Sequence, residues 1–312
     1  FKSRGRNREE ASLGQVQHLR EYQIIFYLNE EKNYAIQPLC RLLQVTRSAY
    51  YHWRDHPLSD RERKNQRLAQ AIRQIHQAHP DMGYRRIRDE LYGRYGLSVS
   101  DKRVLHICRY EEIQSTIKSP ANSMTTPAKS PYHTAENILD RHFHAEAPNE
   151  KWCTDISEFR YGNGDRKHRM YLSAILDLYD RRIVAYKLSD QMPLSLVTDT
   201  LDQAVTAEPK AQPIFHSDRG KQYTSKQFHT KLRDLGMTQS MSRVGKCIDN
   251  GPMEGFWGML KREQYYRRHF ETRQELTDMI TEYIDYYNHR RFQRRLNVLP
   301  PMTYHERFYQ AA

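Results

Sequence analysis

The sequence predicts an α/β domain with a mixed sheet flanked by helices, preceded by all-α units. Three observations predict this fold class. Up to about residue 118, apolar residues recur at the spacing of amphipathic helices. From residue 150 onward, alternating and continuous apolar runs of strand length take over, and later runs alternate with helical patterns. A stretch rich in Pro, Ser and Thr separates the two patterns, so we expect distinct domains joined by a linker.

The composition favours a polyanionic partner. The 312-residue chain carries 50 Lys and Arg against 38 Asp and Glu, a formal net charge of +12. A basic side chain set on a phosphate releases a condensed counterion, so the excess suits DNA or RNA, although many basic proteins bind neither. The first 120 residues hold the larger share of the excess and are the stronger candidate for nucleic-acid contact.

Other classes of protein are disfavoured by the same sequence. No apolar run is long enough to span a bilayer and no secretory signal opens the chain, so we expect no membrane partner. The 4 Cys stand far apart without a CxxC pair, and the 15 His form no spaced ligand set. A disulfide framework and a zinc site are therefore disfavoured, and a reducing cytoplasm fits.

The first helical unit spans residues 31–60 and follows a basic amino-terminal segment, residues 1–30, that ends in a helix. Residues 35–55 are interpreted as two short helices with a turn at residues 44–46. This arrangement is typical of a helix-turn-helix, whose second helix lies in the DNA major groove, although any small helical hairpin has the same pattern. The exposed face of the second helix would carry Arg47, Ser48 and Tyr51.

A second helical unit spans residues 61–118. Gly96 is suited to end one of its helices, and Ser100 is suited to cap the next. Its basic residues would lie outside the apolar seam, either as a solvated face or, as we favour, as a second DNA-binding helix-turn-helix. These residues are Arg85, Arg86, Arg88, Lys102 and Arg103.

The linker occupies residues 119–149, the α/β domain residues 150–290, and a basic tail residues 291–312. The tail either lies along DNA or closes the core as a solvated segment. We expect strands at residues 151–159, 170–177, 182–189 and 213–217, helices at 195–207, 225–235, 252–265 and 274–290, and a loop at 239–251.

Three carboxylates stand where this fold would bring them together. Asp155 lies within the first strand, Asp218 ends the fourth, and Glu254 lies in the first turn of a helix. Taken singly, Asp155 is explained as a strand-end acid, and Glu254 as an acid favoured by the helix dipole. A cluster of acids without a cation would repel itself, and oxygen ligands suit Mg²⁺. The three acids in this order therefore favour a divalent cation site.

Three motifs carry a resemblance to a known family. They are WCTDIS around Asp155, HSDRGKQY around Asp218 and DNGPMEGFWGMLKRE around Glu254, with 35 residues between the last two acids. Together they resemble the DDE catalytic core of insertion-sequence transposases, above all the insertion-sequence-three family, whose core is similar to that of retroviral integrases. RLLQVTRSAYYHW and HPDMGYRRIRDEL resemble that family's helix-turn-helix units. The resemblance covers residues 34–309 and implies an RNase H-like fold for the α/β core.

The resemblance also implies a chemistry. Asp155, Asp218 and Glu254 would be the catalytic acids and would hold two Mg²⁺ ions, for which Mn²⁺ would substitute. One ion would lie between Asp155 and Asp218, the other between Asp155 and Glu254, and both would serve attack on a phosphodiester. The family's basic residue falls on Lys261, two helical turns after Glu254, where it would hold a DNA phosphate.

The implied protein is a bacterial, cytoplasmic transposase that cleaves and transfers DNA strands at insertion-sequence ends. Its partners would be double-stranded DNA, both the terminal repeats and the target. Because two ends must be held at once, we expect a homo-oligomer, at least a dimer on DNA. The chain starts at Phe1, and the family leads us to expect a further helix-turn-helix or coiled coil encoded upstream.

Two rival functions stay open on the sequence. A metal-dependent nuclease of the same fold, such as a junction resolvase, would cleave DNA without joining it. A helix-turn-helix regulator with a degenerate core would bind DNA without turnover, but the intact trio of acids disfavours it. Strand transfer by a DNA 3′-hydroxyl separates these functions.

Overall fold

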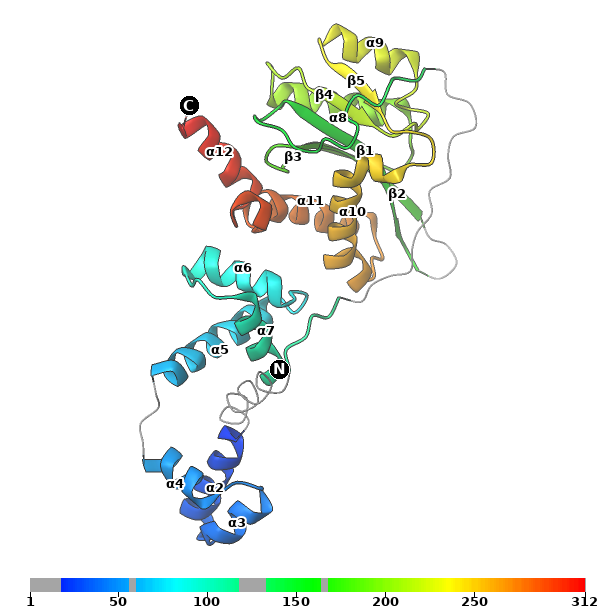
Figure 1. Ribbon diagram of the computed structural model, residues 1–312. Coiled ribbons are helices and arrows are strands. Elements are labelled where there is room, and N and C mark those ends of the chain that lie inside the picture. The colour runs from blue at the N-terminus through cyan, green and yellow to red at the C-terminus, as the bar shows by residue number, and fades with distance from the viewer. Residues whose placement is uncertain (1–17, 56–59, 118–132, 164–167, 312) are drawn as a thin grey trace. The chain divides into compact units, whose positions relative to one another are not determined.

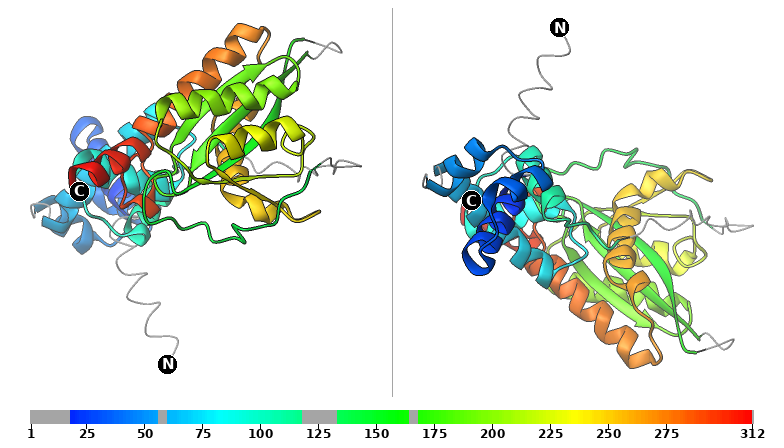
Figure 2. Two further views of the ribbon diagram at one scale, coloured as in Figure 1. Left: turned by 90° about the horizontal axis from the view of Figure 1, so that it is seen from above. Right: turned by 90° about the horizontal axis from the view of Figure 1, so that it is seen from below.

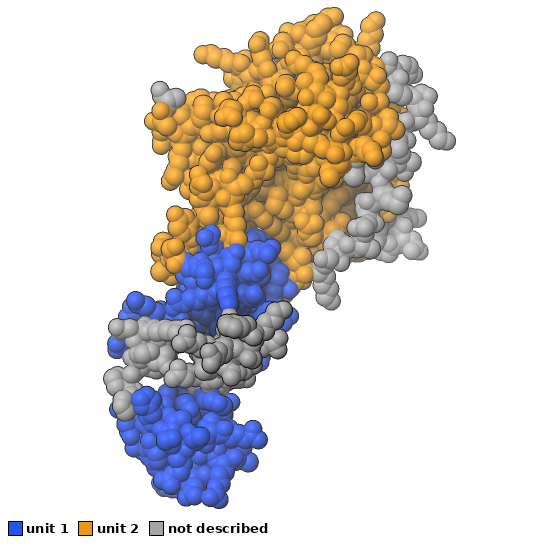
Figure 3. Space-filling view, viewed as in Figure 1, with its two compact units in different colours: residues 1–88, 99–115 blue, residues 89–98, 116–312 orange. Residues whose placement is uncertain are grey.

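The computed structural model describes residues 18–55, 60–117, 133–163 and 168–311. The chain divides into two compact units, residues 1–88 with 99–115 and residues 89–98 with 116–312 (Figure 3). Residues 1–17 of the predicted basic segment and residues 119–132 of the predicted linker lie outside the described residues.

Three helices form the first helical unit: α2 (Leu19–Lys32), α3 (Ile36–Leu42) and α4 (Arg47–Asp55) (Figure 1). They enclose a small apolar core that includes Ile25, Cys40 and Tyr50. In the turn between α3 and α4, Gln44 adopts the left-handed conformation with φ 54°. The two short helices and the turn predicted from the sequence are confirmed.

The next stretch contains α5 (Asp60–Ala78), α6 (Tyr84–Tyr95) and α7 (Asp101–Tyr110). Gly96 follows α6 with φ 66°, a conformation that costs little for glycine. The Ser100 hydroxyl caps α7 by accepting a hydrogen bond from the Arg103 backbone N–H at 3.3 Å. The roles predicted for Gly96 and Ser100 are therefore confirmed.

Five strands form one mixed sheet in the order β3-β2-β1-β4-β5. The first three strands make an antiparallel meander, whereas β4 runs parallel to β1 and β5 runs parallel to β4. The mixed sheet predicted from the sequence is confirmed. The strands are β1 (Lys151–Tyr161), β2 (His168–Asp177), β3 (Ile183–Ser189), β4 (Ile214–Ser217) and β5 (Thr238–Met241).

The interpretation of residues 239–251 as a loop is wrong at its start, where β5 lies. The buried side chains of this strand are largely polar and find polar partners. Gln239 Oε1 lies 2.8 Å from His229 Nδ1, and Ser240 Oγ lies 2.9 Å from His216 Nδ1. A four-residue strand whose single apolar side chain is Met241 carries no apolar alternation, so the sequence pattern could not reveal it.

Helices cover both faces of the sheet, as Figure 2 shows from above and below. On one face, α8 (Leu194–Ala207) and α9 (Lys226–Asp234) pack around Trp152. On the other face, α10 (Gly251–Glu263) and α11 (Arg273–His289) pack around Cys153 and Phe159. Because side chains alternate along a strand, Asp155 projects from β1 on the side covered by α10.

The chain ends in a helix, α12 (Pro301–Ala311), within the segment that the sequence analysis treats as a tail. The Tyr179 ring, beyond the end of β2, lies 5.3 Å from the rings of both Tyr304 and Phe308, between centroids. His305 Nδ1 lies 2.7 Å from Asp180 Oδ2. These contacts fix α12 against the turn between β2 and β3. None of the helices in the described ranges has the length and apolar character needed to cross a membrane.

Candidate active site

Asp155 is held at both carboxylate oxygens. Oδ1 accepts a hydrogen bond from the Ile156 backbone N–H at 2.8 Å. Oδ2 accepts one from the indole Nε1 of Trp257, on α10, at 3.0 Å. The strand and the helix packed on it therefore fix the orientation of this carboxylate together.

Asp218 follows the last residue of β4. Because β4 runs parallel to β1 and pairs His216 with Cys153, the register brings Asp218 alongside Asp155. Asp218 Oδ1 accepts a hydrogen bond from the Gly220 backbone N–H at 2.9 Å. A Cβ atom at residue 220 would lie 3.0 Å from the same oxygen, so glycine allows the turn to close on the carboxylate.

The two acids form an electrostatically strained pair. Burial and the charge of Asp218 raise the pKa of Asp155 from its ordinary 3.8 to about 7. Burial also raises the pKa of Asp218. In the described part of the chain, neither acid forms an ion pair with Lys or Arg. A pair of carboxylates without a cationic partner fits a divalent cation, which prefers oxygen ligands.

Glu254 is exposed in the first turn of α10. Its charge is among the causes that raise the pKa of Asp155, after burial and Asp218. Within the described residues, no three His, Cys, Asp or Glu side chains stand close enough together to hold a metal ion. The structure thus brings Asp155 and Asp218 together and leaves Glu254 near them but outside the cluster.

The segment before Glu254 is clamped by Asp249, which is fully buried. Asp249 accepts hydrogen bonds from Arg243 Nε and Nη2, both at 2.8 Å, and from Arg141 Nε at 2.7 Å. These bonds hold the pKa of Asp249 well below its usual range, with the Arg243 side chain as the main cause. The next residue, Asn250, donates its Nδ2 to the Thr154 carbonyl at 3.0 Å and so fastens the start of α10 to β1.

Lys261 lies on α10, two turns beyond Glu254. Its Nζ lies 5.0 Å from the centroid of the Phe159 ring. Burial lowers the pKa of its ammonium group, and the charges of Asp155 and Glu158 oppose that shift. The charge of Asp155 therefore reaches this cation.

The residues predicted to contact DNA through α4 lie on one side of that helix. Arg47 and Ser48 are exposed, and Tyr51 is half-buried. The Tyr51 ring centroid lies 5.8 Å from Arg47 Cζ and 4.7 Å from Arg54 Cζ, within reach of cation–π attraction. The ring therefore packs between two basic side chains.

The residues of α6 and α7 that are predicted to contact DNA differ in the contacts that they make within the protein. Arg85 and Lys102 are exposed. Arg86 Nη1 lies 2.8 Å from Asp81 Oδ2 in an ion pair. Arg103 donates Nε and Nη2 to Asn65 Oδ1 at 3.1 and 2.6 Å. Arg86 is partly buried and Arg103 is exposed, and both take part in contacts within the helical unit.

The sequence analysis missed Trp257 and Tyr223. The Tyr223 hydroxyl lies 3.2 Å from Thr154 Oγ1, and Asp155 adds to burial in raising the Tyr223 pKa. Trp257 stands three residues after Glu254, so the two side chains lie about one helical turn apart. The indole N–H of a buried tryptophan needs a hydrogen-bond acceptor, and a carboxylate close to Trp257 could have been predicted on that ground.

Comparison with protein families supports this description of the chain. Two families described as integrase core domains match residues 145–247 and 254–308. A family described as an HTH-like domain matches residues 63–121, which confirms the second helix-turn-helix unit. Among solved structures, the HTLV-2 integrase catalytic core in complex with magnesium matches at 15% identity and a TM-score of 0.40, covering 51% of this chain and 98% of that one.

Similar proteins include the InsK transposase of insertion sequence element IS150 from Escherichia coli. It is 35% identical over 285 residues, which cover 90% of this chain and 98% of that protein. The 31 kDa protein of insertion element IS600 from Shigella sonnei is 33% identical, over 88% of this chain and 100% of that protein. The InsF transposase of insertion sequence IS3A from Escherichia coli is 29% identical, over 84% and 90%. The chain belongs to the insertion-sequence-three family of transposases, with an integrase-type catalytic core.

Proposed function

We propose that this transposase cleaves DNA strands at the ends of its insertion sequence and joins the freed 3′-ends to DNA through Asp155, Asp218 and Glu254. One observation carries the assignment of residues. Asp155 and Asp218 are adjacent, repel each other and lack a cationic partner among the described residues, and the helix beside them bears a third acid. Family membership supplies the reaction class, which is phosphoryl transfer on DNA.

Divalent metal ions, when bound, activate the attacking oxygen and neutralise the leaving 3′-oxygen. Asp155 would contribute to both of two Mg²⁺ sites, with Asp218 completing one and Glu254 the other, and Mn²⁺ would substitute. Glu254 is exposed, and its charge already acts on the Asp155 carboxyl. The Ile156 and Trp257 N–H groups keep Asp155 oriented during the reaction.

The basic residues serve to hold the DNA. Lys261 would take a strand phosphate beside the acids, because a partly buried ammonium group gains most from an anion that replaces its lost hydration. The helix-turn-helix units, residues 31–60 and 61–118, would bind terminal repeats. The first unit would do so through Arg47, Ser48 and Tyr51 on α4, and the second through Arg85 on α6 and Lys102 on α7. The linker (119–149) would join these units to the core (150–290).

Two DNA ends must be held together for joining, so we propose a homo-oligomer that is at least a dimer on DNA. Target DNA would be its second nucleic-acid partner. The relatives are bacterial proteins, and we place this transposase in the bacterial cytoplasm, where its DNA lies.

The test is strand transfer on labelled DNA that carries the element's own ends, with Mg²⁺ or Mn²⁺, for the wild-type chain and Glu254→Gln. We expect the variant to lose at least about 100-fold of the joined product, since the amide is a poor ligand for a hard cation. DNA binding, measured by gel shift, should persist. Glu254 is an exposed residue of the catalytic domain and is far in sequence from the residues of α4 that we propose bind DNA. Asp234→Asn, an exposed acid paired with Arg233, is the matched control and should join DNA normally.

Other results would change the assignment. Nicking without joining by the wild-type chain would indicate a nuclease. Equal joining by the wild type and Glu254→Gln would mean that a different carboxylate completes the site. DNA binding without any turnover would indicate a regulator with an inactive core.

A further inference from the structure

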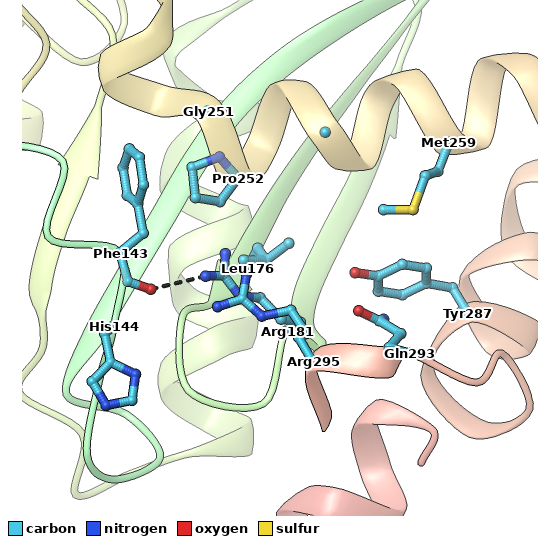
Figure 4. Close-up of a pocket in the computed structure, with 11 residues that line it drawn as sticks. Phe143, His144, Leu176, Arg181, Gly251, Pro252, Met259, Tyr287, Gln293 and Arg295 are labelled. Atoms are coloured by element: carbon cyan, nitrogen blue, oxygen red, sulfur yellow. Dashed lines mark hydrogen bonds between the residues drawn. The ribbon is translucent and has the colours of Figure 1, made fainter. Parts of the chain in front are cut away.

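A pocket of about 540 Å³ opens beside α10, on a different face of that helix from Glu254 and Lys261 (Figure 4). Phe143, Pro252, Met259 and Tyr287 form much of its wall. Two guanidinium groups, those of Arg181 and Arg295, lie at its centre in Figure 4. The pocket is thus lined by apolar groups around a concentrated positive charge.

Arg181 is a buried charged side chain in the wall of this pocket. It lies in the turn between β2 and β3, is 5% exposed, and donates Nη2 to the Phe143 carbonyl at 2.8 Å. Its Nε is buried without a hydrogen-bond partner, and it forms no ion pair with any carboxylate that the structure describes. A buried charged donor in this condition is rare, because the loss of hydration is uncompensated.

The acids around Arg181 are engaged by other groups. The charge of Asp177 acts on Arg181, but the Asp177 carboxylate accepts two backbone N–H hydrogen bonds. Arg182, the next residue, pairs with Asp180 at 3.3 Å and with Glu208 at 2.5 Å. Arg181 faces a second cation, since burial first and then the charge of Arg295 lower its pKa to about 10. Burial also lowers the pKa of Arg295, which forms no ion pair within the described residues. The two guanidinium groups therefore repel each other across an open pocket.

A third donor adds to the set. Gln293 lines the pocket and is 9% exposed, and its Nε2 is buried without a hydrogen bond of standard geometry, although its side chain also acts on the Tyr287 hydroxyl. Two guanidinium groups and an amide N–H together match an anion with several oxygens, and guanidinium groups bind phosphate in this way. A phosphate offers more acceptor oxygens than a carboxylate, and the volume leaves room for a group attached to it.

We propose that this pocket binds a phosphate group of a nucleic-acid strand, held by Arg181, Arg295 and Gln293, with the apolar walls taking the adjoining sugar or base. The anion site rests on the pocket alone. Its assignment to nucleic acid rests on the proposed function, since a DNA transferase supplies phosphates in that form.

The test compares the full-length wild type with Arg295→Gln in two binding measurements that require no catalysis. Inorganic phosphate, against chloride at matched ionic strength, should raise the melting temperature of the wild type, and the variant should bind phosphate at least about tenfold more weakly. Binding to a short DNA duplex of mixed sequence is then measured as a function of salt concentration. The slope of log affinity against log salt should be smaller in magnitude for the variant than for the wild type, by about 0.9, the value for one phosphate contact. Arg233→Gln, which removes an exposed arginine of α9, is the matched control and should change neither measurement.

Each remaining outcome overturns the proposal or part of it. Lost phosphate binding with an unchanged salt slope would assign the pocket to a free phosphate compound. Loss of self-association with unchanged phosphate binding would assign it to an acidic side chain of a second copy. No change in either measurement would remove the site. Arg181→Gln, which also removes a buried charge, gives the same readings if Arg295→Gln does not fold. The strand-transfer test with Glu254→Gln is independent, so its failure is distinguishable from failure of this site.

Discussion

Asp155→Asn should abolish strand transfer and, in the absence of metal, make the protein more stable. Activity should fall by more than about 1,000-fold, the scale reached when a group in contact with the reacting atoms is removed. In EDTA at pH 8, the free energy of unfolding should rise by about 1–3 kcal/mol, because the amide relieves repulsion with Asp218 and the cost of burying a charge. One hydrogen bond, from Ile156 or Trp257, is weakened and offsets part of this gain.

The pH dependence of that difference follows from the raised pKa. The folded chain holds the Asp155 proton up to a pKa of about 7, whereas the unfolded chain releases it near 3.8. The contribution of protonated Asp155 to stability is therefore present below 3.8 and is lost as pH rises to about 7. Subtracting the wild-type unfolding free energy from that of the variant should give a difference that grows over this range and is constant above it. Thermal and urea unfolding in EDTA measure it. A variant no more stable than the wild type at pH 8 would contradict the strained pair.

Asp249→Ala should have a large effect on the stability of the core. Asp249 accepts hydrogen bonds from Arg243, Arg141 and also Asn137, whose Nδ2 lies 3.1 Å from Oδ2. Removing the buried carboxylate takes its partner from Arg141 and leaves Arg243 with Asp140 alone, at 3.4 Å. The free energy of unfolding, measured by urea denaturation, should fall by about 1–3 kcal/mol. Strand transfer should fall as well, because the loop that sets the start of α10 loses its fixed form.

The control for Asp249→Ala is Asp234→Ala. Asp234 also pairs with an arginine, Arg233 at 2.9 Å, but both side chains are more than half exposed. The exposed pair is screened by water, so its loss should change stability by less than about 0.5 kcal/mol. Equal, small effects of the two substitutions would show that the Asp249 network is not a structural clamp.

The sequence was most informative where the signal was periodic or chemical. Alternation predicted β1 and its neighbours, and the spacing of acids in characteristic motifs predicted that Asp155 and Asp218 would meet. That meeting depends on the parallel pairing of β1 and β4, which the alternation of helix and strand after β3 implies. The end of α6 at Gly96 and the start of α7 at Ser100 could also be predicted from the sequence. Glycine tolerates the positive φ that follows a helix, and a serine hydroxyl caps a helix N-terminus.

The remainder depends on contacts between distant parts of the chain. The indole of Trp257 reaches Asp155 across 102 residues, and Arg141 reaches Asp249 across 108. The pocket joins Arg181, in a turn, to Arg295, near the carboxyl end. Such pairs leave no periodic trace in a single sequence. The largely polar strand β5 was missed for a different reason, since its buried Gln239 and Ser240 form hydrogen bonds with histidines of neighbouring elements and show no apolar pattern.

The central claim is that Asp155, Asp218 and Glu254 together hold two divalent cations, although Glu254 stands outside the cluster here. Anomalous diffraction from Mn²⁺, in crystals of the full chain with DNA that ends in a 3′-hydroxyl, tests it most directly. We expect two peaks, each about 2.1 Å from its carboxylate oxygens, one shared by Asp155 and Asp218 and one shared by Asp155 and Glu254. Peaks that leave Glu254 without metal, in a complex that still joins DNA, would contradict the claim.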